Sequence, residues 1–386
     1  MIARIYIFIV LAIVLPDVYV YVRYLRRRTD LSLLQHMLWW VPGIIMTAYT
    51  IGLSLIRDFA PGDMTWLNVY LFMFGLIIVP KLLFVTCSFA GLIARRVFSL
   101  KRNWGNFVGI VLVLFSLYML IYGSTVGVRK FTVKHVNLYF DDLPSAFDGY
   151  RIVQFTDLHA GSIEAELVER TVETINSLDA DAVVFTGDIQ NMLPDELNRY
   201  DTELSSIKAK DGVFSVLGNH DYSIYVNADS SICMANERRL ISLERSYGWT
   251  LLMNEHRVIR RGSDSIVIAG EENGGKAPFP QKSDLKKTLS GVSSGTFIVL
   301  LQHDPSAWRR YILSGSDVRL TLSGHTHGGQ ISMFGHRPTQ LSGVEDSGLY
   351  REGRHFLYVS TGVGGLVPFR FGIAPEIVVF TLHKIK

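Results

Sequence analysis

Cysteine is nearly absent from the sequence, and charged residues are sparse. Only Cys87 and Cys233 occur among 386 residues, so neither a disulfide framework nor a cysteine-based zinc site can be built from them. Charged residues make up 19% of the chain and hydrophobic residues 48%, with a mean hydropathy of +0.24. These values exclude a disordered chain and argue against a wholly water-soluble one. At this length we expect two domains.

The small net charge of +3 conceals two halves of opposite sign. Residues 1–128 hold 11 Lys and Arg against 4 Asp and Glu, whereas residues 129–386 hold 27 against 31. The acidic balance of the second half argues against a nucleic-acid-binding surface. We therefore predict an apolar, basic domain over residues 1–128 and an acidic domain of ordinary soluble composition over residues 129–386.

Four apolar stretches in the first half have the length of membrane spans. They cover Ile5–Val22, Met37–Ile56, Trp66–Ile93 and Phe107–Val128, and each is near the ~20 residues that cross a ~30 Å hydrocarbon core. A cleavable signal peptide fits the first stretch poorly, because no small-residue cleavage site follows it and arginines do. We predict a transmembrane α-helical region of four spans.

Arginine-rich loops set the expected orientation. Basic clusters follow the first and third stretches, at residues 23–28 and 95–102, whereas Asp58 and Asp63 accompany Arg57 in the loop between the second and third. By the positive-inside rule the two basic loops are cytoplasmic. We therefore expect a multi-pass protein of the cytoplasmic (inner) membrane whose second half is extracytoplasmic.

Asp17 and Lys81 are ionisable residues inside apolar stretches. Such residues are candidates for an ion or proton path, but they also form buried pairs or reach towards an interface. Counting back from the arginines that follow each stretch places the two residues at depths ~12 Å apart. We favour a structural role for them.

Five short apolar runs in the second half end at polar turns. Each run is followed within three residues by Asp, Asn or His. The runs are Ile152–Phe155, Ala182–Phe185, Val213–Leu217, Phe297–Leu301 and Val318–Leu322. Apolar residues at helical spacing predict a helix over Ile163–Leu178, between the first two runs. Strand, helix and strand predict an α/β sheet, and ligands of such sheets gather at the carboxyl ends of strands.

The polar residues after these runs form five blocks that contain five of the 11 histidines. The blocks are Asp157-x-His159, Gly187-Asp188, Gly218-Asn219-His220-Asp221, His303 and Gly324-His325-x-His327. In this order they resemble the motifs of the calcineurin-like metallophosphoesterases, and of their membrane-associated bacterial branch in particular. The likeness covers about residues 133–386. The second block continues Ile-Gln-Asn, a small departure from the family pattern that we expect to touch none of the ligands.

The resemblance implies a fold, two cofactors and a set of residue roles. The fold is an α/β metallophosphoesterase domain, a two-sheet sandwich flanked by helices. Two divalent metal ions are implied, and carboxylate, imidazole and amide ligands suit Mn, Zn or Fe. The implied ligands of one ion are Asp157, His159, Asp188 and His327, and those of the other are Asp188, Asn219, His303 and His325. His220 is implied to protonate the leaving oxygen, with Asp221 orienting it.

These expectations describe a membrane-anchored, two-metal-dependent phosphohydrolase. It would cleave a phosphoester or pyrophosphate bond of a small molecule or of a lipid-linked substrate, among membrane lipids. One alternative is a UDP-2,3-diacylglucosamine-type pyrophosphatase of lipid A synthesis, although such relatives work on the cytoplasmic side. Another is a non-enzymatic transporter or sensor with a regulatory metal domain, supported only by Asp17 and Lys81. Substrate, metal identity and oligomeric state stay open.

A glycine-rich segment and three arginines are further candidates to contact a phosphate. Residues 270–277 nearly spell a phosphate-binding P-loop, but Ala277 lacks the required hydroxyl, and Pro278 and Pro280 prevent the helix that must follow. We expect this segment to be a rim loop of the phosphoesterase site. Arg370 is a candidate to contact a phosphate, as is the pair Arg309 and Arg310, for which surface solvation is the simpler role.

Overall fold

A computed structural model of the chain describes residues 2–56, 64–226 and 228–385. The chain divides into two compact units, one ending at Ser124 and the other continuing from Thr125 to the C-terminal end. The loop that carries Arg57, Asp58 and Asp63, whose charges entered the orientation argument, lies outside the described residues.

Among the described residues, four helical segments are long and apolar enough to cross a membrane, which confirms the predicted spans. They are formed by α1 (Ile2–Val20) with the helical turn Tyr21–Leu25, by α2 (Leu33–Leu38) with α3 (Val41–Leu55), by α4 (Thr65–Val97), and by α5 (Trp104–Thr125). A short 3-10 turn, Gly127–Arg129, follows α5. Pro80 lies within α4 and does not end it.

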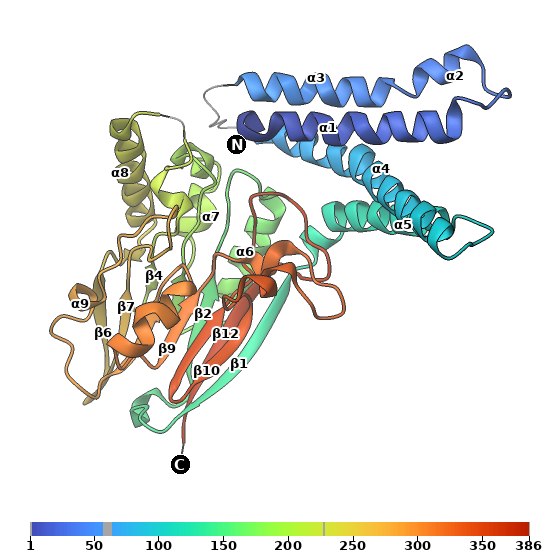
Figure 1. Cartoon of the computed structure of the whole chain (residues 1–386). Coiled ribbons are helices and arrows are strands. Elements are labelled where there is room, and N and C mark those ends of the chain that lie inside the picture. Colours follow the sequence, from blue (N-terminus) through green and yellow to red (C-terminus); the bar gives the residue numbers. More distant parts are fainter. Residues whose placement is uncertain (1, 57–63, 227, 386) are drawn as a thin grey trace. The chain divides into compact units, whose positions relative to one another are not determined.

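Close backbone approach holds part of this unit together. Helices α1 and α3 lie side by side (Figure 1), and α4 meets α5 at glycines. A Cβ atom on Gly105 of α5 would overlap the Cys87 carbonyl and the Cα of Gly91 in α4. Small residues at such contacts let helix backbones pack directly, which is a main source of helix association within a bilayer.

Asp17 and Lys81 form an ion pair inside the membrane unit. The Lys81 Nζ lies 2.6 Å from Asp17 Oδ1, and the ammonium also lies 5.0 Å from the centre of the Trp39 ring. The predicted ~12 Å difference in depth was therefore wrong. Helix α4 has 33 residues and is about 50 Å long, well beyond a ~30 Å core, so counting back from its terminal arginines misplaced Lys81. A buried pair was one of the structural roles considered.

The second unit contains two six-stranded mixed sheets. The first has, in spatial order, β1 (Thr132–Phe140), β12 (Glu376–Lys384), β2 (Tyr150–Phe155), β3 (Ala182–Phe185), β4 (Val213–Ser215) and β5 (Thr250–Leu251). The second has β10 (Gly348–Glu352), β11 (His355–Val359), β9 (Leu320–Ser323), β8 (Phe297–Leu301), β7 (Asp264–Gly270) and β6 (Glu255–Arg261).

Four adjacent strands of each sheet run parallel to one another. Strands β2, β3, β4 and β5 are parallel neighbours, as are β7, β8, β9 and β11. All five predicted runs are strands, although β4 ends at Ser215 and β9 begins at Leu320. Because parallel strands end at the same edge, the loops after them gather in one place.

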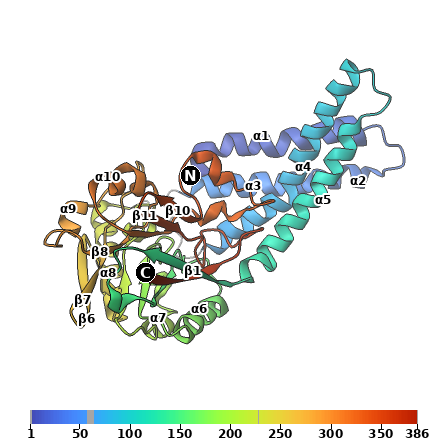
Figure 2. The same ribbon diagram turned by 90° about the horizontal axis from the view of Figure 1, so that it is seen from below.

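Helices cover the outer faces of both sheets, and an apolar core fills the space between the sheets. Helices α6 (Ala165–Ser177), α7 (Asp201–Ser205) and α8 (Ser230–Ser246) pack on the first sheet, whereas α9 (Leu285–Thr288) and α10 (Leu313–Gly315) pack on the second. Figure 2 shows α9 and α10 on one side of the strands and α6 and α7 on the other. This confirms the predicted two-sheet sandwich flanked by helices.

Candidate active site

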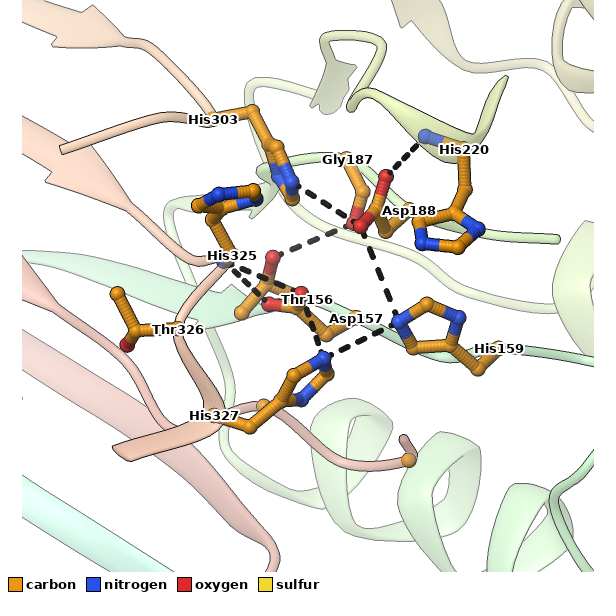
Figure 3. A network of polar contacts seen from close by, with 12 residues as sticks. Thr156, Asp157, His159, Gly187, Asp188, His220, His303, His325, Thr326 and His327 are labelled. Atoms are coloured by element: carbon orange, nitrogen blue, oxygen red, sulfur yellow. Dashed lines mark hydrogen bonds and ion pairs between the residues drawn. The ribbon is translucent and has the colours of Figure 1, made fainter. Parts of the chain in front are cut away.

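The five predicted blocks meet at the carboxyl ends of β2, β3, β4, β8 and β9. Figure 3 shows the side chains of Asp157 and of five histidines gathered around Asp188. All seven predicted metal ligands are in this group or, in the case of Asn219, in contact with it: the Asn219 Oδ1 lies 3.1 Å from His303 Nε2. The family resemblance of the sequence motifs therefore implied ligands that the fold brings together.

Asp157, His159 and His327 form the first group with metal-binding geometry. One ligand atom of each lies within 4.8 Å of the others. The Nε2 atoms of His159 and His327 are 3.2 Å apart, and His327 Nε2 is 3.6 Å from Asp157 Oδ1. Imidazole nitrogens and a carboxylate oxygen that converge in this way suit a divalent cation without requiring thiolate.

Asp188, His303 and His325 form the second group. Asp188 Oδ2 lies 3.1 Å from His303 Nε2 and 3.8 Å from His159 Nε2 of the first group. The Asp188 carboxylate thus faces both groups. The donor atoms fit two neighbouring ions, with Asp188 between them.

The backbone is strained at this cluster. Asp157, His159, Asp188, His325 and His327 all have φ between 50° and 76°, a left-handed conformation that is uncommon outside glycine. Gly187 precedes Asp188 with φ +97°, and a Cβ there would overlap the Gly218 backbone and the His303 ring. Strain of this kind persists where the surrounding fold enforces it, and it concentrates at functional sites.

Hydrogen bonds fix the orientation of two of the imidazoles. The Nδ1 of His303 lies 2.7 Å from the Thr186 carbonyl oxygen, and the Nδ1 of His159 lies 3.0 Å from Asn191 Oδ1. A carbonyl oxygen only accepts, so each Nδ1 carries a proton and each Nε2 is the nitrogen turned towards the ligand groups. The expectation that the Ile-Gln-Asn departure touches no ligand was therefore wrong, because Asn191 holds His159.

Burial keeps several of these histidines neutral. It lowers the pKa of His159 to about 3 and that of His325 to about 4, and together with the neighbouring His159 ring it lowers the pKa of His327 well below its ordinary value. Neutral imidazole is the form that binds metal. Burial would also lower the pKa of His303, but attraction to Asp188 outweighs it and raises that pKa to about 10.

The carboxyl groups show the opposite response to burial. Burial raises the pKa of Asp157 and that of Asp221 to about 7, and the charge of Asp188 adds to both shifts. Burial would raise the pKa of Asp188 as well, but neighbouring histidines, His303 first, hold it well below its ordinary value. A cation among these carboxylates would offset the cost of burying them ionised.

His220 lies beside both groups. Its Nδ1 is 2.6 Å from the Asn191 carbonyl oxygen, its backbone N–H donates to Asp188 Oδ1 at 2.8 Å, and its ring centre is 4.9 Å from that of His159. The ring is thus oriented by Asn191. The predicted role of Asp221 in orienting His220 was wrong.

Asp221 joins two loops of the site instead. Its carboxylate accepts backbone N–H groups of Gly218 at 2.7 Å, Asp188 at 2.8 Å and Ile189 at 3.0 Å. These bonds fix the turn that follows β4 against the turn that follows β3. A sequence-adjacent acid looked like the partner of His220, but the 3-10 turn His220–Tyr222 directs the two side chains to different neighbours.

Sequence reasoning did not identify Asn191 or Tyr225 as site residues. The Tyr225 hydroxyl accepts a hydrogen bond of 2.7 Å from Asn219 Nδ2, and its ring lies 4.5 Å from the His220 ring. The position of Asn191, three residues after Asp188, was visible in the second block. Nothing in the local sequence marks Tyr225, because its contact with the site depends on the turn after His220.

The rim segment and the arginines have protein partners. The Phe279 ring packs edge-on against His325 at 5.0 Å, which places the segment after β7 at the rim. Arg310 donates to the carbonyl oxygens of Gly274 and Gly275 in that segment, and Arg309 pairs with Glu345. Arg370 is 2% exposed and donates to the carbonyls of His327, Gly362 and Gly364. These arginines therefore stabilise loops.

Comparison with known proteins agrees with this geometry. The family model described as calcineurin-like phosphoesterase matches residues 150–329, and that of the probable transmembrane domain of calcineurin-like phosphoesterases matches residues 3–128. The uncharacterized metallophosphoesterase YkuE of Bacillus subtilis is 34% identical over 253 residues, which cover 63% of this chain and 82% of YkuE.

Two other relatives extend the likeness. The uncharacterized metallophosphoesterase Cj0846 of Campylobacter jejuni is 26% identical over the full length of both chains. The UDP-2,3-diacylglucosamine pyrophosphatase LpxG of Chlamydia trachomatis is 30% identical over 61% of this chain and 85% of its own length. With its membrane helices and its two ligand groups, this chain belongs to the calcineurin-like metallophosphoesterases, as a membrane-associated, metal-dependent phosphoesterase with a dimetal site.

Proposed function

We propose that the protein is a membrane-anchored two-metal hydrolase that cleaves a phosphoester or pyrophosphate bond of a lipid-linked substrate. The observation that carries the proposal is the position of Asp188, which faces a ligand group on each side. Asp157, His159 and His327 complete the ligands of one ion, and the remaining ligands of the other are Asn219, His303 and His325. Residues 129–386 form the catalytic domain, and residues 1–128 the anchor.

The ions would neutralise charge on the phosphoryl oxygens and activate a water molecule as the nucleophile. The residues of the chain supply the rest. Because the Asn191 carbonyl fixes the His220 proton on Nδ1, Nε2 is the atom that exchanges a proton with a substrate. His220 thereby serves as the general acid for the leaving oxygen, and Tyr225 orients both its ring and Asn219.

The membrane location supports a lipid-linked substrate. Four spans retain the catalytic domain close to a bilayer, where a phosphate attached to a lipid is always within reach. The arginine-rich loops support an extracytoplasmic catalytic domain in the inner membrane. The donor set suits Mn, Zn or Fe.

LpxG supports a more specific second candidate, a UDP-2,3-diacylglucosamine-type pyrophosphatase. That nucleotide-linked substrate would require the catalytic domain to face the cytoplasm. A reporter fused to the C-terminus distinguishes the two locations: alkaline phosphatase is active only outside the cytoplasm, and a fluorescent protein that folds in the cytoplasm reports the opposite orientation.

Activity is tested on the full chain in lipid nanodiscs with added Mn²⁺, Zn²⁺ or Fe²⁺. Phosphomonoesters, phosphodiesters and lipid pyrophosphates are offered in parallel, and Asp188→Asn is the matched control. We expect metal-dependent cleavage of at least one class by the wild type and none by the variant. Equal rates in the two proteins, or no cleavage of any class with any of the metals, would overturn the proposal.

A further inference from the structure

An apolar pocket adjoins the first ligand group within the catalytic unit. It is a narrow, partly open groove: water-sized molecules have ≈ 30 Å³ for their centres, and the ≈ 390 Å³ between its walls includes open solvent. Its apolar walls are Val128, Ile163, Leu167, Val363, Val367 and Phe369. These side chains come from the start of α6, from the loop after β11 and from the segment before β1.

Two wall residues connect the pocket to the candidate ligands by hydrogen bonds, one directly and one through Asn191. Ser162 accepts a hydrogen bond from Asn191, whose Oδ1 holds His159. The Gly364 N–H donates to the Asp157 carbonyl oxygen at 2.8 Å. The pocket therefore lies next to the residues that hold the first ligand group.

The polar side chains in the pocket wall are already engaged with protein groups. Ser162 donates to the Leu366 carbonyl, Gln330 to the carbonyls of Val367 and Phe369, and Glu164 pairs with Arg129 at 2.8 Å. Arg370, the fourth polar wall residue, donates to carbonyl oxygens as described above. Among the described residues, the pocket thus offers apolar surface and no unpaired charge, which favours a hydrocarbon ligand over a polar one.

The chain also indicates where such a ligand would come from. The fourth membrane span ends at Arg129, so the wall residue Val128 is one residue from the end of that span along the chain. Two side chains on the segment after Gln330 are almost fully exposed, Phe334 at 97% and Leu341 at 92%. Ser332 of that segment donates to the Phe371 carbonyl beside the pocket wall at 2.7 Å. Exposed apolar groups of this kind suit contact with lipid.

We propose that this pocket binds an acyl chain of the substrate, so that the enzyme selects phosphorylated lipids by their hydrocarbon as well as by their phosphate. The inference rests on the proposed hydrolase function and names its substrate class. Each methylene buried in the pocket is expected to raise kcat/KM about fourfold until the pocket is full.

The test uses alkyl 4-nitrophenyl phosphodiesters from methyl to octyl, and a matching series of alkyl diphosphates, with the full chain in nanodiscs. Val367→Trp fills the pocket. Leu366→Trp, next in the chain but outside the pocket lining, is the control. Longer substrates also partition into the nanodisc, but that effect is the same for all three proteins, so the difference between variants isolates the pocket.

We expect Val367→Trp to cleave the methyl substrate at the wild-type rate and to lose most of the gain with chain length, whereas Leu366→Trp keeps it. If Val367→Trp fails to fold, Phe369→Asp, which puts a charge in the same pocket, is expected to give the same selective loss. Equal chain-length dependence in wild type and pocket variants overturns the acyl site and leaves the hydrolase intact. Absence of cleavage in both series, and of every substrate class offered in the activity test above, overturns the hydrolase and the acyl site with it.

Discussion

His159 and His327 point their Nε2 atoms at each other across 3.2 Å. The Nδ1 of His159 holds its proton towards Asn191, so its Nε2 presents a lone pair to the same space that Asp157 and His327 face. Side chains 168 positions apart in the sequence thus share one small volume, in which a cation resolves the repulsion between lone pairs and carboxylates.

Removing divalent metal is expected to destabilise the catalytic domain. Ions that bind only the folded state at about 100 times their Kd contribute about 2.7 kcal/mol, so chelation is expected to lower the melting temperature by about 5–10 °C. Differential scanning fluorimetry with EDTA and then with Mn²⁺ measures the loss and its recovery. Asp188→Asn serves as the control, and a shift of equal size in that variant would assign the effect to another metal site.

His220→Ala is expected to retain both ions but lose turnover. A positioned general acid contributes about 10²–10⁴-fold, and His220 is not in either ligand group. Metal content by mass spectrometry and kcat on the best substrate are measured together. His256→Ala is the matched control, because that ring also has its Nδ1 on a carbonyl oxygen, that of Thr288. Full activity in His220→Ala would refute its assignment.

Asn191→Ala is expected to weaken metal binding about 10- to 100-fold, because it frees the Nδ1 of His159 and so loosens a ligand. Asn191→Asp keeps an acceptor for that proton and is expected to restore most of the affinity. Titration of the stripped protein with Mn²⁺ gives the Kd values. If both variants bind as the wild type does, the hydrogen bond to His159 has no part in holding the metal.

Glu244→Gln is expected to change how stability depends on pH. Glu244 is fully buried and accepts a hydrogen bond from Ser215 at 2.6 Å, and burial raises its pKa from 4.5 to about 8. Between these values the folded state holds a proton that the unfolded state has lost, so stability falls as pH rises. The glutamine side chain of the variant does not titrate, so the variant does not lose this stability as pH rises. We therefore expect the melting temperature of the variant minus that of the wild type to be larger at pH 8 than at pH 5.

A control for that experiment lies on the same helix. Glu237→Gln removes a carboxylate that pairs with Lys282 at 2.8 Å, and any general effect of removing one charge from α8 appears in it too. A melting difference that does not change with pH in Glu244→Gln would show that Glu244 is ionised in the folded protein throughout this range.

Lys81→Met is expected to destabilise the membrane unit, because it leaves the Asp17 carboxylate buried without its 2.6 Å partner. The double variant Asp17→Asn with Lys81→Met is expected to recover much of the loss. Thermal melts of the two single variants and the double variant in nanodiscs give the coupling. Additive effects would show that the pair does not stabilise the fold.

The site could be predicted from the sequence because each block is local. A β-strand followed by a short polar turn places its polar residue at the strand end, and the resemblance of the five blocks to a family pattern implied that Asp157, Asp188 and His303 are ligands of one site. The partners of these residues could not be predicted in the same way. Asn191 reaches His159 only because two loops pack together, and Asp221 turns away from His220 because of one short turn.

In the membrane region, too, the sequence predicted the elements but not the contacts between them. Hydropathy located all four helices, since composition and length suffice for that. The relation of Asp17 to Lys81 depends on where along a helix the bilayer begins, and α4 extends far enough to make its arginines a poor reference. The contact between Asp17 and Lys81 could be seen only in the folded structure, because counting residues along the chain gave the wrong depth for Lys81.

Asn191 orients two imidazole rings of the site. Its side chain holds the imidazole of His159, and its backbone carbonyl holds that of His220. A displacement of this residue would move the metal-binding ring and the proton-donating ring together. The geometry of cation binding and the geometry of proton delivery therefore cannot be adjusted separately at this position, and any natural variation there would have to suit both at once.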